Sequence, residues 1–301
     1  MAHFLNLAQE TLVTHLVDGR TIAVTMATSA AAEADVLRSG GITPTLAVLV
    51  PTDDAGAAWY VRSIQRAATR TGIACQVHQM GAPASAPPSA EQISGRLAGL
   101  GRDPAVHGVI CQTPLPAGVD LPQVGMAIPP GKDVDGANPA SLGGLAAGLP
   151  GFFAPATAAA VLVILQHERV PLRGRRAVVV GRSAVVGKPA ALLLLAGHAT
   201  VTIAHSRTPD LRAVCREADI LVVAAGQPKL IGAEHVRAGA VVIDVGTTPT
   251  EGGGLAGDVD AAAVTGIASV LTPVPGGVGP VTTAVLMEHT LQAAARAAER
   301  D

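Results

Sequence analysis

Aromatic residues are scarce in this chain of 301 residues, and their scarcity argues against one class of partner. The only ones are Phe4, Trp59, Tyr60, Phe152 and Phe153. Proteins that bind nucleic acids stack bases on aromatic side chains and present basic surfaces to the phosphates. Since this chain has few aromatics and a formal net charge of −2, we expect no nucleic-acid partner.

Cysteine is also rare. Cys75, Cys111 and Cys215 lie far apart in the sequence, with no C-x-x-C spacing and no histidine cluster beside them. This pattern predicts reduced, buried thiols and no metal site.

Long apolar runs are missing as well. No stretch approaches the length of a membrane-spanning helix, and the amino terminus lacks a basic segment followed by an apolar one. We therefore expect a cytoplasmic protein without membrane partners.

A stretch rich in glycine and valine is the feature around which the second half of the chain is organised. Residues 177–180 are apolar and mostly β-branched, which predicts a strand buried on both faces of a parallel sheet. Gly181 and Gly187 follow, and Pro189 suits the first position of a helix over 189–196. Free N–H groups at such a helix start bind anions. An ordinary tight turn between strand and helix would have the same G-x5-G spacing, so the glycines alone leave both interpretations open.

Residues that follow the next predicted strand, 201–204, favour one cofactor. An NAD site usually has Asp or Glu at this point, where the carboxylate binds the ribose 2′-hydroxyl. This chain has His205, Ser206 and Arg207 there, together with Arg182 on the first loop, and such donors suit a 2′-phosphate. The pattern indicates NADP. The alternative is that the two arginines are ordinary surface residues.

Two polar clusters follow predicted elements of the first half. In Gln112-Thr113-Pro114-Leu115-Pro116, two X-Pro units hold Gln112 at the carboxyl end of the predicted strand 106–111, the edge at which open α/β sheets bind ligands. Lys132-Asp133-Val134-Asp135-Gly136 places two carboxylates beside the same edge. A solvated acidic turn is the alternative for the second cluster.

The alternation of predicted strands and helices indicates an α/β fold throughout. In the first half, a predicted helix over 57–71 puts Tyr60 and Ile64 on one face. Gly148 to Thr157 is the best candidate for a linker between two domains. In the second half, the predicted strands 177–180, 201–204, 219–224 and 240–245 alternate with the predicted helices 189–196, 209–217 and 233–238, which indicates a doubly wound parallel sheet.

The stretch from Leu271 to Pro280 contains three prolines and three glycines in ten residues. This composition predicts a rigid, irregular loop whose backbone can approach a ligand closely. A final helix over 281–299 is expected to pack back onto the first domain.

Together these stretches resemble the methylenetetrahydrofolate dehydrogenase/cyclohydrolase family along nearly the whole chain. The matching segments are residues 17–20, 60–61, 106–108, 112–116, 132–136, 181–183, 186–189, 244–246 and 272–280.

The resemblance implies a fold of two domains and a homodimer. One is an α/β catalytic domain, residues 1–149 joined by the C-terminal helix 281–301. The other is a Rossmann-like NADP domain with a doubly wound parallel sheet, residues 150–280. A tetrahydrofolate derivative would bind in the cleft between them, and the dimer would form through the NADP domain.

The resemblance also implies roles for individual residues. Tyr60, Gln112 and Asp135 would be catalytic and would bind the substrate, and Ile64 takes the place of the family's lysine. Pro275, Gly276 and Gly277 would complete the substrate site. The residues expected to bind the cofactor are Gly181, Arg182, Ser183, Val186, Gly187, His205, Ser206, Arg207, Ala225, Gly226, Asp244, Gly246 and Thr247.

Departures from the family pattern lie on the folate side. Besides Ile64, Thr52 to Ala57 replaces a Gly-x-x-x-Ala-Ser loop, Pro155 to Ala160 replaces Pro-Cys-Thr-Pro-x-Gly, and Gly144 replaces an arginine. Hydride transfer needs no protein base, whereas hydrolysis of the methenyl product does. The leading hypothesis is thus an NADP-dependent methylenetetrahydrofolate dehydrogenase of one-carbon metabolism with weak or absent cyclohydrolase activity.

Two alternatives stay open at this point. One is an enzyme of a specialised pathway that oxidises or reduces a related cyclic aminal or imine, which the folate-side departures would allow. The other is a catalytically silent subunit that binds folate or NADP.

Overall fold

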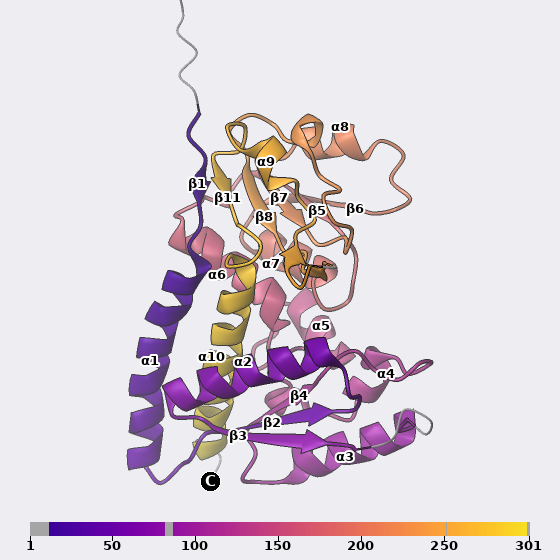
Figure 1. Cartoon of the computed structure of the whole chain (residues 1–301). Coiled ribbons are helices and arrows are strands. Elements are labelled where there is room, and N and C mark those ends of the chain that lie inside the picture. The colour runs from indigo at the N-terminus through magenta and orange to yellow at the C-terminus, as the bar shows by residue number, and fades with distance from the viewer. Residues whose placement is uncertain (1–11, 82–86, 251, 300–301) are drawn as a thin grey trace, which may run out of the picture.

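The computed structural model describes residues 12–81, 87–250 and 252–299. It contains two parallel sheets, one above the other in Figure 1, with long helices running between them. Buried apolar residues form clusters on both faces of each sheet. The predicted α/β fold with two domains is confirmed. Residues 1–11 and 300–301, which were predicted to belong to the first domain, lie outside the described residues.

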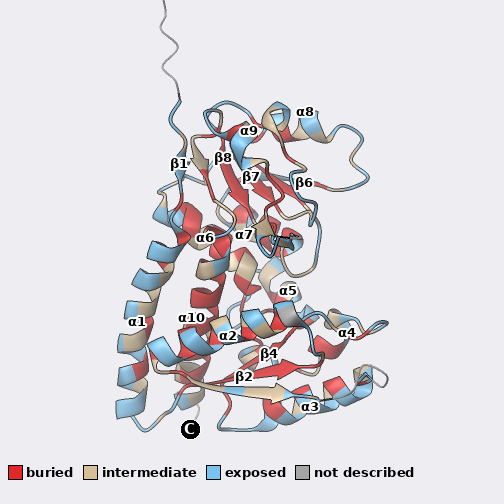
Figure 2. Cartoon of the chain, in the orientation of Figure 1, coloured by how far each residue is buried: buried red, intermediate tan, exposed pale blue. Residues whose placement is uncertain are grey.

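The smaller sheet has three strands in the order β3-β2-β4. Its part of the chain comprises α1 (Gly19–Ser39), β2 (Thr45–Val50), α2 (Ala55–Thr71), β3 (Ala74–Gln79), α3 (Ala90–Arg102), β4 (Gly108–Cys111), α4 (Leu121–Gly125), the 3-10 turn η1 (Pro130–Lys132) and α5 (Pro139–Ala146). All of β2 is buried (Figure 2), as expected for a central parallel strand. Leu46 and Val48 share one apolar cluster with Ile64 of α2, while Ala47 and Leu49 pack on the other face with Leu97 of α3.

The larger sheet has six parallel strands in the order β1-β11-β8-β7-β5-β6. Its elements are β1 (His15–Leu16), α6 (Ala156–His167), β5 (Arg176–Val180), α7 (Gly187–Ala196), β6 (Thr200–Ala204), α8 (Leu211–Arg216), β7 (Ile220–Val223), the 3-10 turn η2 (Ala233–His235), β8 (Val241–Asp244), α9 (Ala261–Val264) and β11 (Val270–Leu271), with a small hairpin of β9 (Thr248–Pro249) and β10 (Leu255–Ala256). β6 lies on one side of β5 and β7 on the other. The loop after β5 therefore leaves the sheet at a topological switch point, where doubly wound folds bind their ligands.

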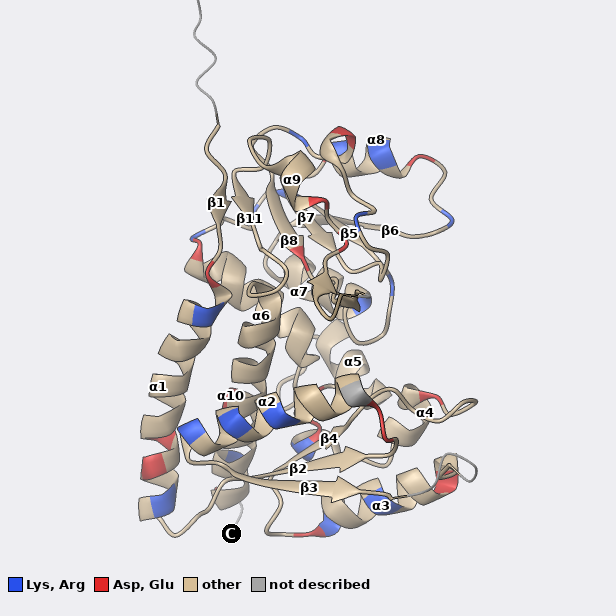
Figure 3. Cartoon of the chain, viewed as in Figure 1, with Lys and Arg blue, Asp and Glu red and all other residues tan. Residues whose placement is uncertain are grey.

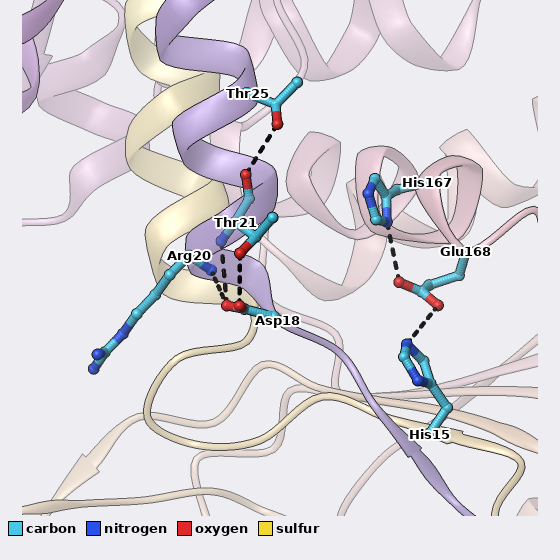
Figure 4. Close-up of polar contacts among 7 residues, drawn as sticks. All are labelled: His15, Asp18, Arg20, Thr21, Thr25, His167 and Glu168. Carbon is cyan, nitrogen blue, oxygen red and sulfur yellow. Dashed lines mark hydrogen bonds and ion pairs between the residues drawn. The ribbon is translucent and has the colours of Figure 1, made fainter.

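Two elements, β1 and the C-terminal helix, pack across from one sheet's part of the chain to the other. Strand β1 precedes α1, yet it pairs with β11 of the larger sheet. The Glu168 carboxylate, at the end of α6, accepts from His15 Nε2 of this strand and from His167 Nδ1, both at 3.1 Å (Figure 4). The C-terminal helix α10 (Val278–Ala298) packs against α1, α2 and α6, as predicted for a helix that returns to the first domain.

Several sequence-based predictions differ from the structure. Val278 to Pro280 form the first turn of α10 instead of loop, because a proline in a first turn forgoes no helical hydrogen bond. The predicted helix 233–238 is a single 3-10 turn. Of the three free cysteines, Cys75 is half-buried rather than buried. Within the described part of the chain, no helix combines the length and apolarity needed to cross a membrane.

Candidate active site

The loop after β5 is shaped by two glycines that have no room for a side chain. Gly181 has φ of +128°, and a Cβ there would lie 2.1 Å from the carbonyl oxygen of Ala224. A Cβ on Gly187 would lie 2.2 Å from the carbonyl oxygen of Gly181. The start of α7 is thus packed directly against the end of the strand. The Ser183 hydroxyl accepts from the N–H groups of Val186 and Gly187 at 3.2 and 3.3 Å, which holds the loop in place.

The loop after β6 leaves the same edge beside it, because β5 and β6 are parallel neighbours and the Gly181 N–H donates to the Ala204 carbonyl at 2.8 Å. The His205 N–H donates to Thr208 Oγ1 at 2.9 Å, and the Arg207 N–H donates to His205 Nδ1 at 3.1 Å. These bonds form a tight turn that leaves the side chain of Arg207 exposed.

Arg182, Ser206 and Arg207 are all exposed on these two loops. Among the described residues neither arginine has an ion-pair partner. Two free guanidinium groups and a hydroxyl beside a helix start are a donor set that fits a phosphate group.

Two carboxylates organise the remaining cofactor-side loops. The buried Asp244, at the end of β8, accepts from the N–H groups of Gly246, Asp258 and Val259 at 2.9 to 3.0 Å. Burial raises the pKa of Asp244 to about 6, against the effect of these bonds. Asp258 in turn accepts from the N–H groups of Ala225 and Gly226 at 2.6 and 2.8 Å.

Asp258 was not singled out from the sequence, although Gly257-Asp258-Val259 right after the glycine-rich hairpin could have drawn attention to it. Its Oδ2 accepts from both N–H groups of the loop after β7. Its Oδ1 is buried and has no hydrogen-bond partner among the described residues. A Cβ on Gly246 would lie 2.5 Å from this carboxylate. The predicted cofactor residues Ala225, Gly226, Asp244 and Gly246 are therefore held in one compact network, and Thr247 follows it, exposed.

At the smaller sheet, Tyr60 and Asp135 come together from separate segments. Burial raises the pKa of the Tyr60 phenol, and the negative charge of Asp135 raises it further, while a hydrogen bond with the Thr283 hydroxyl of α10 acts in the opposite direction. Burial, followed by the charge of Asp135, raises the pKa of the Cys111 thiol to about 12. Cys111 precedes Gln112 at the end of β4, so Tyr60 and Asp135 lie near that edge of the small sheet. Neither Thr283 nor Cys111 was predicted to belong to the site.

The Asp135 carboxylate titrates near neutrality. Burial is the main cause that raises its pKa to about 7, the charge of Asp133 adds to it, and the backbone N–H of Ala156 at the start of α6 opposes it. Gly136, with φ of +64°, packs so closely that a Cβ would lie 2.6 Å from the Pro155 nitrogen. This packing places Asp135 between the two sheets, at the linker predicted from the sequence.

The neighbouring Asp133 has a structural role. It is fully buried and accepts from the N–H groups of Ala137 and Asn138 at 2.8 and 2.9 Å and from the Ser141 hydroxyl at 2.6 Å. On the other side, His289 Nδ1 of α10 donates to the Val134 carbonyl at 2.8 Å. Burial lowers the pKa of His289 to about 4, so the imidazole is neutral. The backbone on both sides of Asp135 is therefore fixed.

Ile64 lies one turn after Tyr60 on α2, and its side chain is completely buried in the main apolar cluster. The nearest lysine in sequence is Lys132. Its Nζ donates to the Asp103 carbonyl at 2.7 Å, beyond the amino end of β4, whereas Gln112 stands at the carboxyl end of that strand. Gln112 is itself buried, and its Nε2 donates to the Thr113 carbonyl at 2.7 Å.

The loop with Pro275, Gly276 and Gly277 lies against the start of α1. A Cβ on Gly19 would lie only 1.8 Å from the Gly277 carbonyl oxygen, so the two backbones are in direct contact. Asp18 caps α1 by accepting from the N–H groups of Arg20 and Thr21 at 3.0 and 3.2 Å, and the Arg20 side chain points away from this cap (Figure 4).

Gly144 of α5, which replaces an arginine in the resemblance, is covered by Phe152. A Cβ on Gly144 would lie 2.3 Å from the Phe152 ring. The ring fills the space that any larger side chain at residue 144 would need, so this departure is accommodated by packing.

A separate cavity, of about 350 Å³, lies at the opposite edge of the large sheet, where Arg175, Asp219 and Arg237 are among the lining residues. It faces the amino ends of β5, β7 and β8. Because open α/β sheets bind ligands at the carboxyl ends of their strands, it does not correspond to the cofactor site. Across the described ranges, no three His, Cys, Asp or Glu residues are grouped so that they could hold a metal ion.

Comparison with known proteins gives matches over both domains. Residues 17–135 match the catalytic domain of tetrahydrofolate dehydrogenase/cyclohydrolase, and residues 155–298 match its NAD(P)-binding domain. The chain is 59% identical over 269 residues to bifunctional protein FolD 1 of Saccharopolyspora erythraea, covering 89% of each chain. It is 57% identical over 280 residues to bifunctional protein FolD of Parafrankia, covering 93% of this chain and 98% of the relative.

Solved structures agree with these matches. The bifunctional FolD enzyme of Campylobacter jejuni is 35% identical, with a TM-score of 0.89 over 94% of this chain and 99% of that one. The FolD enzyme of Trypanosoma brucei, solved with NADP and an inhibitor, is also 35% identical, with a TM-score of 0.88 over 95% of this chain and 99% of that one.

Proposed function

Since the chain belongs to the tetrahydrofolate dehydrogenase/cyclohydrolase family, we propose that it catalyses the NADP-dependent oxidation of 5,10-methylenetetrahydrofolate to 5,10-methenyltetrahydrofolate and hydrolyses the product weakly or not at all. The observation that carries this proposal is the contrast on α2: Tyr60 faces Asp135, while Ile64, one turn later, is buried in the core.

The dehydrogenase step needs orientation more than proton transfer. When bound, NADP would supply the hydride acceptor, nicotinamide C4, and the nitrogens that flank the methylene carbon of the substrate would stabilise the positive charge left behind. The protein must hold the substrate in one pose, which can lower the barrier by roughly 7–11 kcal/mol. We assign this to Asp135, whose carboxylate accepts from the N–H donors of a pterin ring through charge-assisted bonds, and to Tyr60 and Gln112 beside it.

The hydrolytic step needs a group that moves protons as the ring nitrogen leaves. General acid or base catalysis typically contributes about 10²- to 10⁴-fold, and an isoleucine contributes none of it. Lys132 is held at the far end of β4, and arginine stays protonated near neutral pH. Asp135, with a pKa of about 7, can exchange a proton but is needed as a carboxylate for the pterin, so we expect little hydrolysis. The relatives named above are described as bifunctional, so weak hydrolysis would distinguish this chain from them.

The choice of NADP rests on the exposed donors Arg182, Ser206 and Arg207. They occupy two neighbouring loops at the switch point of the sheet, and the two arginines are free of ion pairs within the described residues. A ribose 2′-phosphate would satisfy them, whereas a 2′-hydroxyl would leave both guanidinium groups without an anion. The solved relative from T. brucei holds NADP, which supports this choice.

The remaining assignments follow from position. Pro275, Gly276 and Gly277 would present backbone to the substrate, and Ile64 occupies the place of the lysine. The residues assigned to the cofactor are Gly181, Arg182, Ser183, Val186, Gly187, His205, Ser206, Arg207, Ala225, Gly226, Asp244, Gly246 and Thr247. Asp244 would act by holding the backbone of the cofactor loops through its carboxylate, together with Asp258, and not by contacting the cofactor with that carboxylate.

We further propose the domain limits 1–149 with 281–301 and 150–280, and a homodimer formed through the larger sheet. β6 is the last strand on one side of that sheet. Ile203 on this strand is 42% exposed, and Leu195 of the adjoining α7 is 57% exposed. An open strand edge flanked by exposed apolar side chains is suited to pairing with a second copy.

One experiment tests the central proposal. Purified protein is incubated with NADP and methylenetetrahydrofolate, and NADPH and the methenyl product are followed separately. Both should accumulate together. If NADPH forms with a related cyclic aminal but not with the folate, the enzyme instead serves a specialised pathway, the alternative that the departures at Ile64 and Gly144 leave open.

A further inference from the structure

The cavity of about 350 Å³ at the amino ends of β5, β7 and β8 belongs to neither the proposed substrate site nor the cofactor site. Its lining combines apolar side chains with charged ones. The apolar residues are Val170, Pro171, Ile220, Val241 and Val270, and the charged residues are Glu168, Arg169, Arg175, Asp219 and Arg237. An apolar lining with a few charged groups, in a volume of roughly 300–1,000 Å³, is typical of sites that bind small molecules.

Both carboxylates of this lining already have hydrogen-bond donors. Glu168 accepts from two imidazoles, as described above (Figure 4). Asp219 accepts from the Arg176 N–H at 2.9 Å and from Arg237 Nη1 at 2.6 Å. The bond from the Arg176 N–H is the main cause that lowers the pKa of Asp219, and the charges of Arg237 and Arg175 lower it further, so this group stays ionised. Neither carboxylate is left to attract a cation.

Two of the three arginines in the lining have no such partner. Arg169 and Arg175 are exposed on the loop between α6 and β5, and within the described residues neither forms an ion pair. Three guanidinium groups against two carboxylates give the lining a positive charge, which attracts anions. A guanidinium group binds the oxygens of a carboxylate or a phosphate in a planar, bidentate manner. The free groups in the cavity therefore suit an acid.

The backbone of Arg169 has a conformation that favours glycine. Arg169 directly follows Glu168, the C-cap of α6, a basic residue next to an acidic one in Figure 3, and its φ is +54°. Its N–H donates to the Gln166 carbonyl at 3.0 Å, and the Val170 N–H donates to the Leu165 carbonyl at 2.9 Å. These bonds form a Schellman motif, in which the residue with positive φ is usually glycine because a side chain is strained there. An arginine at this position therefore indicates a use for its side chain, which lines the cavity.

We propose that this cavity binds a small organic acid, a molecule with a carboxylate or phosphate group on an apolar body. Arg169 and Arg175 bind the acidic group, and the body lies against the apolar side chains of Val170, Pro171 and Val270. Strand β5 has five residues, so its two ends lie about 13 Å apart. The acid site and the cofactor loops are at opposite ends of this strand, and both can be filled at the same time.

The binding test uses protein saturated with NADP, so that the donors of the cofactor loops are occupied. Calorimetric titration with phenyl phosphate or with phenylacetate should show one saturable site per chain, and the tighter of the two identifies the acidic group that the site prefers. Inorganic phosphate has only the acid and benzyl alcohol only the apolar ring, and each should bind roughly 10-fold more weakly or worse.

Two results of this titration would overturn the inference. If neither ring acid binds saturably, the cavity is not a site for organic acids. If inorganic phosphate binds as tightly as phenyl phosphate, the arginines form a general basic surface and the apolar lining takes no part.

A pair of double variants assigns the binding to the two free arginines. Arg169→Gln with Arg175→Gln should raise the Kd for the tighter ring acid by roughly 3- to 30-fold, given two partly exposed charge pairs. The matched control is Arg173→Gln with Arg176→Gln, which removes the same charge from exposed arginines of the same loop that do not line the cavity. The control should keep the native Kd. An equal loss in both double variants would show that only the overall charge matters and would overturn the inference.

The single variant Arg169→Gly separates binding from folding. Its Tm without ligand should equal or exceed that of the native protein, because glycine adopts a φ of +54° without strain, whereas its Kd for the ring acid should rise. NADP affinity, measured in the same way, should be unchanged in all variants and shows that the larger sheet is intact. A purely structural role for Arg169 predicts the opposite pair of results, a lower Tm with an unchanged Kd, and that outcome would refute the proposed site.

Discussion

The negative charge of Asp135 raises the pKa of the Tyr60 phenol. The two residues belong to different segments, a loop before α5 and the helix α2, and they meet at the carboxyl edge of the small sheet. The pKa of Asp135 itself is about 7. Near neutral pH the site therefore changes between a state with a carboxylate beside the phenol and a state without charge.

The proposed role of Asp135 in substrate binding predicts a selective loss. Asp135→Ala should abolish turnover of methylenetetrahydrofolate, because the N–H donors of the pterin lose their charged acceptor. NADP affinity, measured by calorimetry, should stay the same, since the cofactor loops belong to the other sheet. Asp103→Ala, a change of an exposed carboxylate, is the control. Wild-type turnover in the Asp135 variant would show that the substrate is bound differently.

The raised pKa of Asp135 predicts a pH dependence. Below pH 7 the group is protonated and cannot bind as a carboxylate, so kcat/KM for the folate should fall as the pH drops. At pH 6 roughly a tenth of the molecules carry the carboxylate, and kcat/KM should be about 10-fold lower than at pH 8. A profile that stays flat down to pH 5.5 would contradict the assignment.

The proposed preference for NADP predicts that loss of two arginines will impair the use of NADP and not of NAD. Replacing Arg182 and Arg207 by alanine should raise the KM for NADP by roughly 10- to 100-fold, corresponding to about 1.5–3 kcal/mol for lost hydrogen bonds to a charged group. NAD use should hardly change, because NAD has no 2′-phosphate. Steady-state kinetics with both cofactors checks this. An equal loss for NADP and NAD would place the arginines elsewhere in cofactor binding or in folding.

The burial of Ile64 predicts that the methenyl product accumulates. If hydrolysis depends on a proton relay through a lysine, the native protein should release methenyltetrahydrofolate as it makes NADPH. Ile64→Lys should gain hydrolysis relative to the parent, and Ile64→Met, which has a long side chain without an amine, should not. Thermal unfolding of both variants is needed because a lysine at a fully buried position destabilises the core or loses its proton.

The decisive measurement for this point uses the unmodified protein. Methenyltetrahydrofolate is supplied directly and its disappearance is compared with the rate in buffer. Rapid hydrolysis would show that another group replaces the lysine, and Asp135 would then be the first residue to examine.

The parts of the fold that were predicted correctly are those with local signals. The apolar run before Gly181 and the alternation that follows it depend on neighbouring residues, so β5 to β8 were placed within one or two residues. Strand β3 was missed because Ala74–Gln79 has half-buried residues on both faces and no apolar run. Strands β1 and β11 have two residues each and exist only through pairing with each other and with β8.

The candidate site shows the same difference between features with a local sequence signal and features that depend on contacts distant in sequence. Tyr60, Gln112 and Asp135 were predicted from the sequence, and the effect of the Asp135 charge on the pKa of the Tyr60 phenol indicates that these two side chains are neighbours in the structure. No local sequence pattern could reveal which carboxylates accept hydrogen bonds from the backbone and are therefore structural. Asp133 and Asp244 accept from backbone N–H groups of their own loops, and Asp258 reaches the loop after β7 only because the hairpin folds back.

The path of the chain between the sheets limits how the cleft can move. The chain passes from β1 into α1, from α5 into α6, and from β11 into α10, so three covalent connections bridge the cleft. The first and third of these touch, at Gly19 and Gly277. Any relative movement of the two sheets at that point would therefore have to separate the Gly19 and Gly277 backbones. Because a Cβ at residue 19 has no space there, a substitution at Gly19 would push these two connections apart and displace the sheets relative to each other, although no residue of the candidate site had been altered.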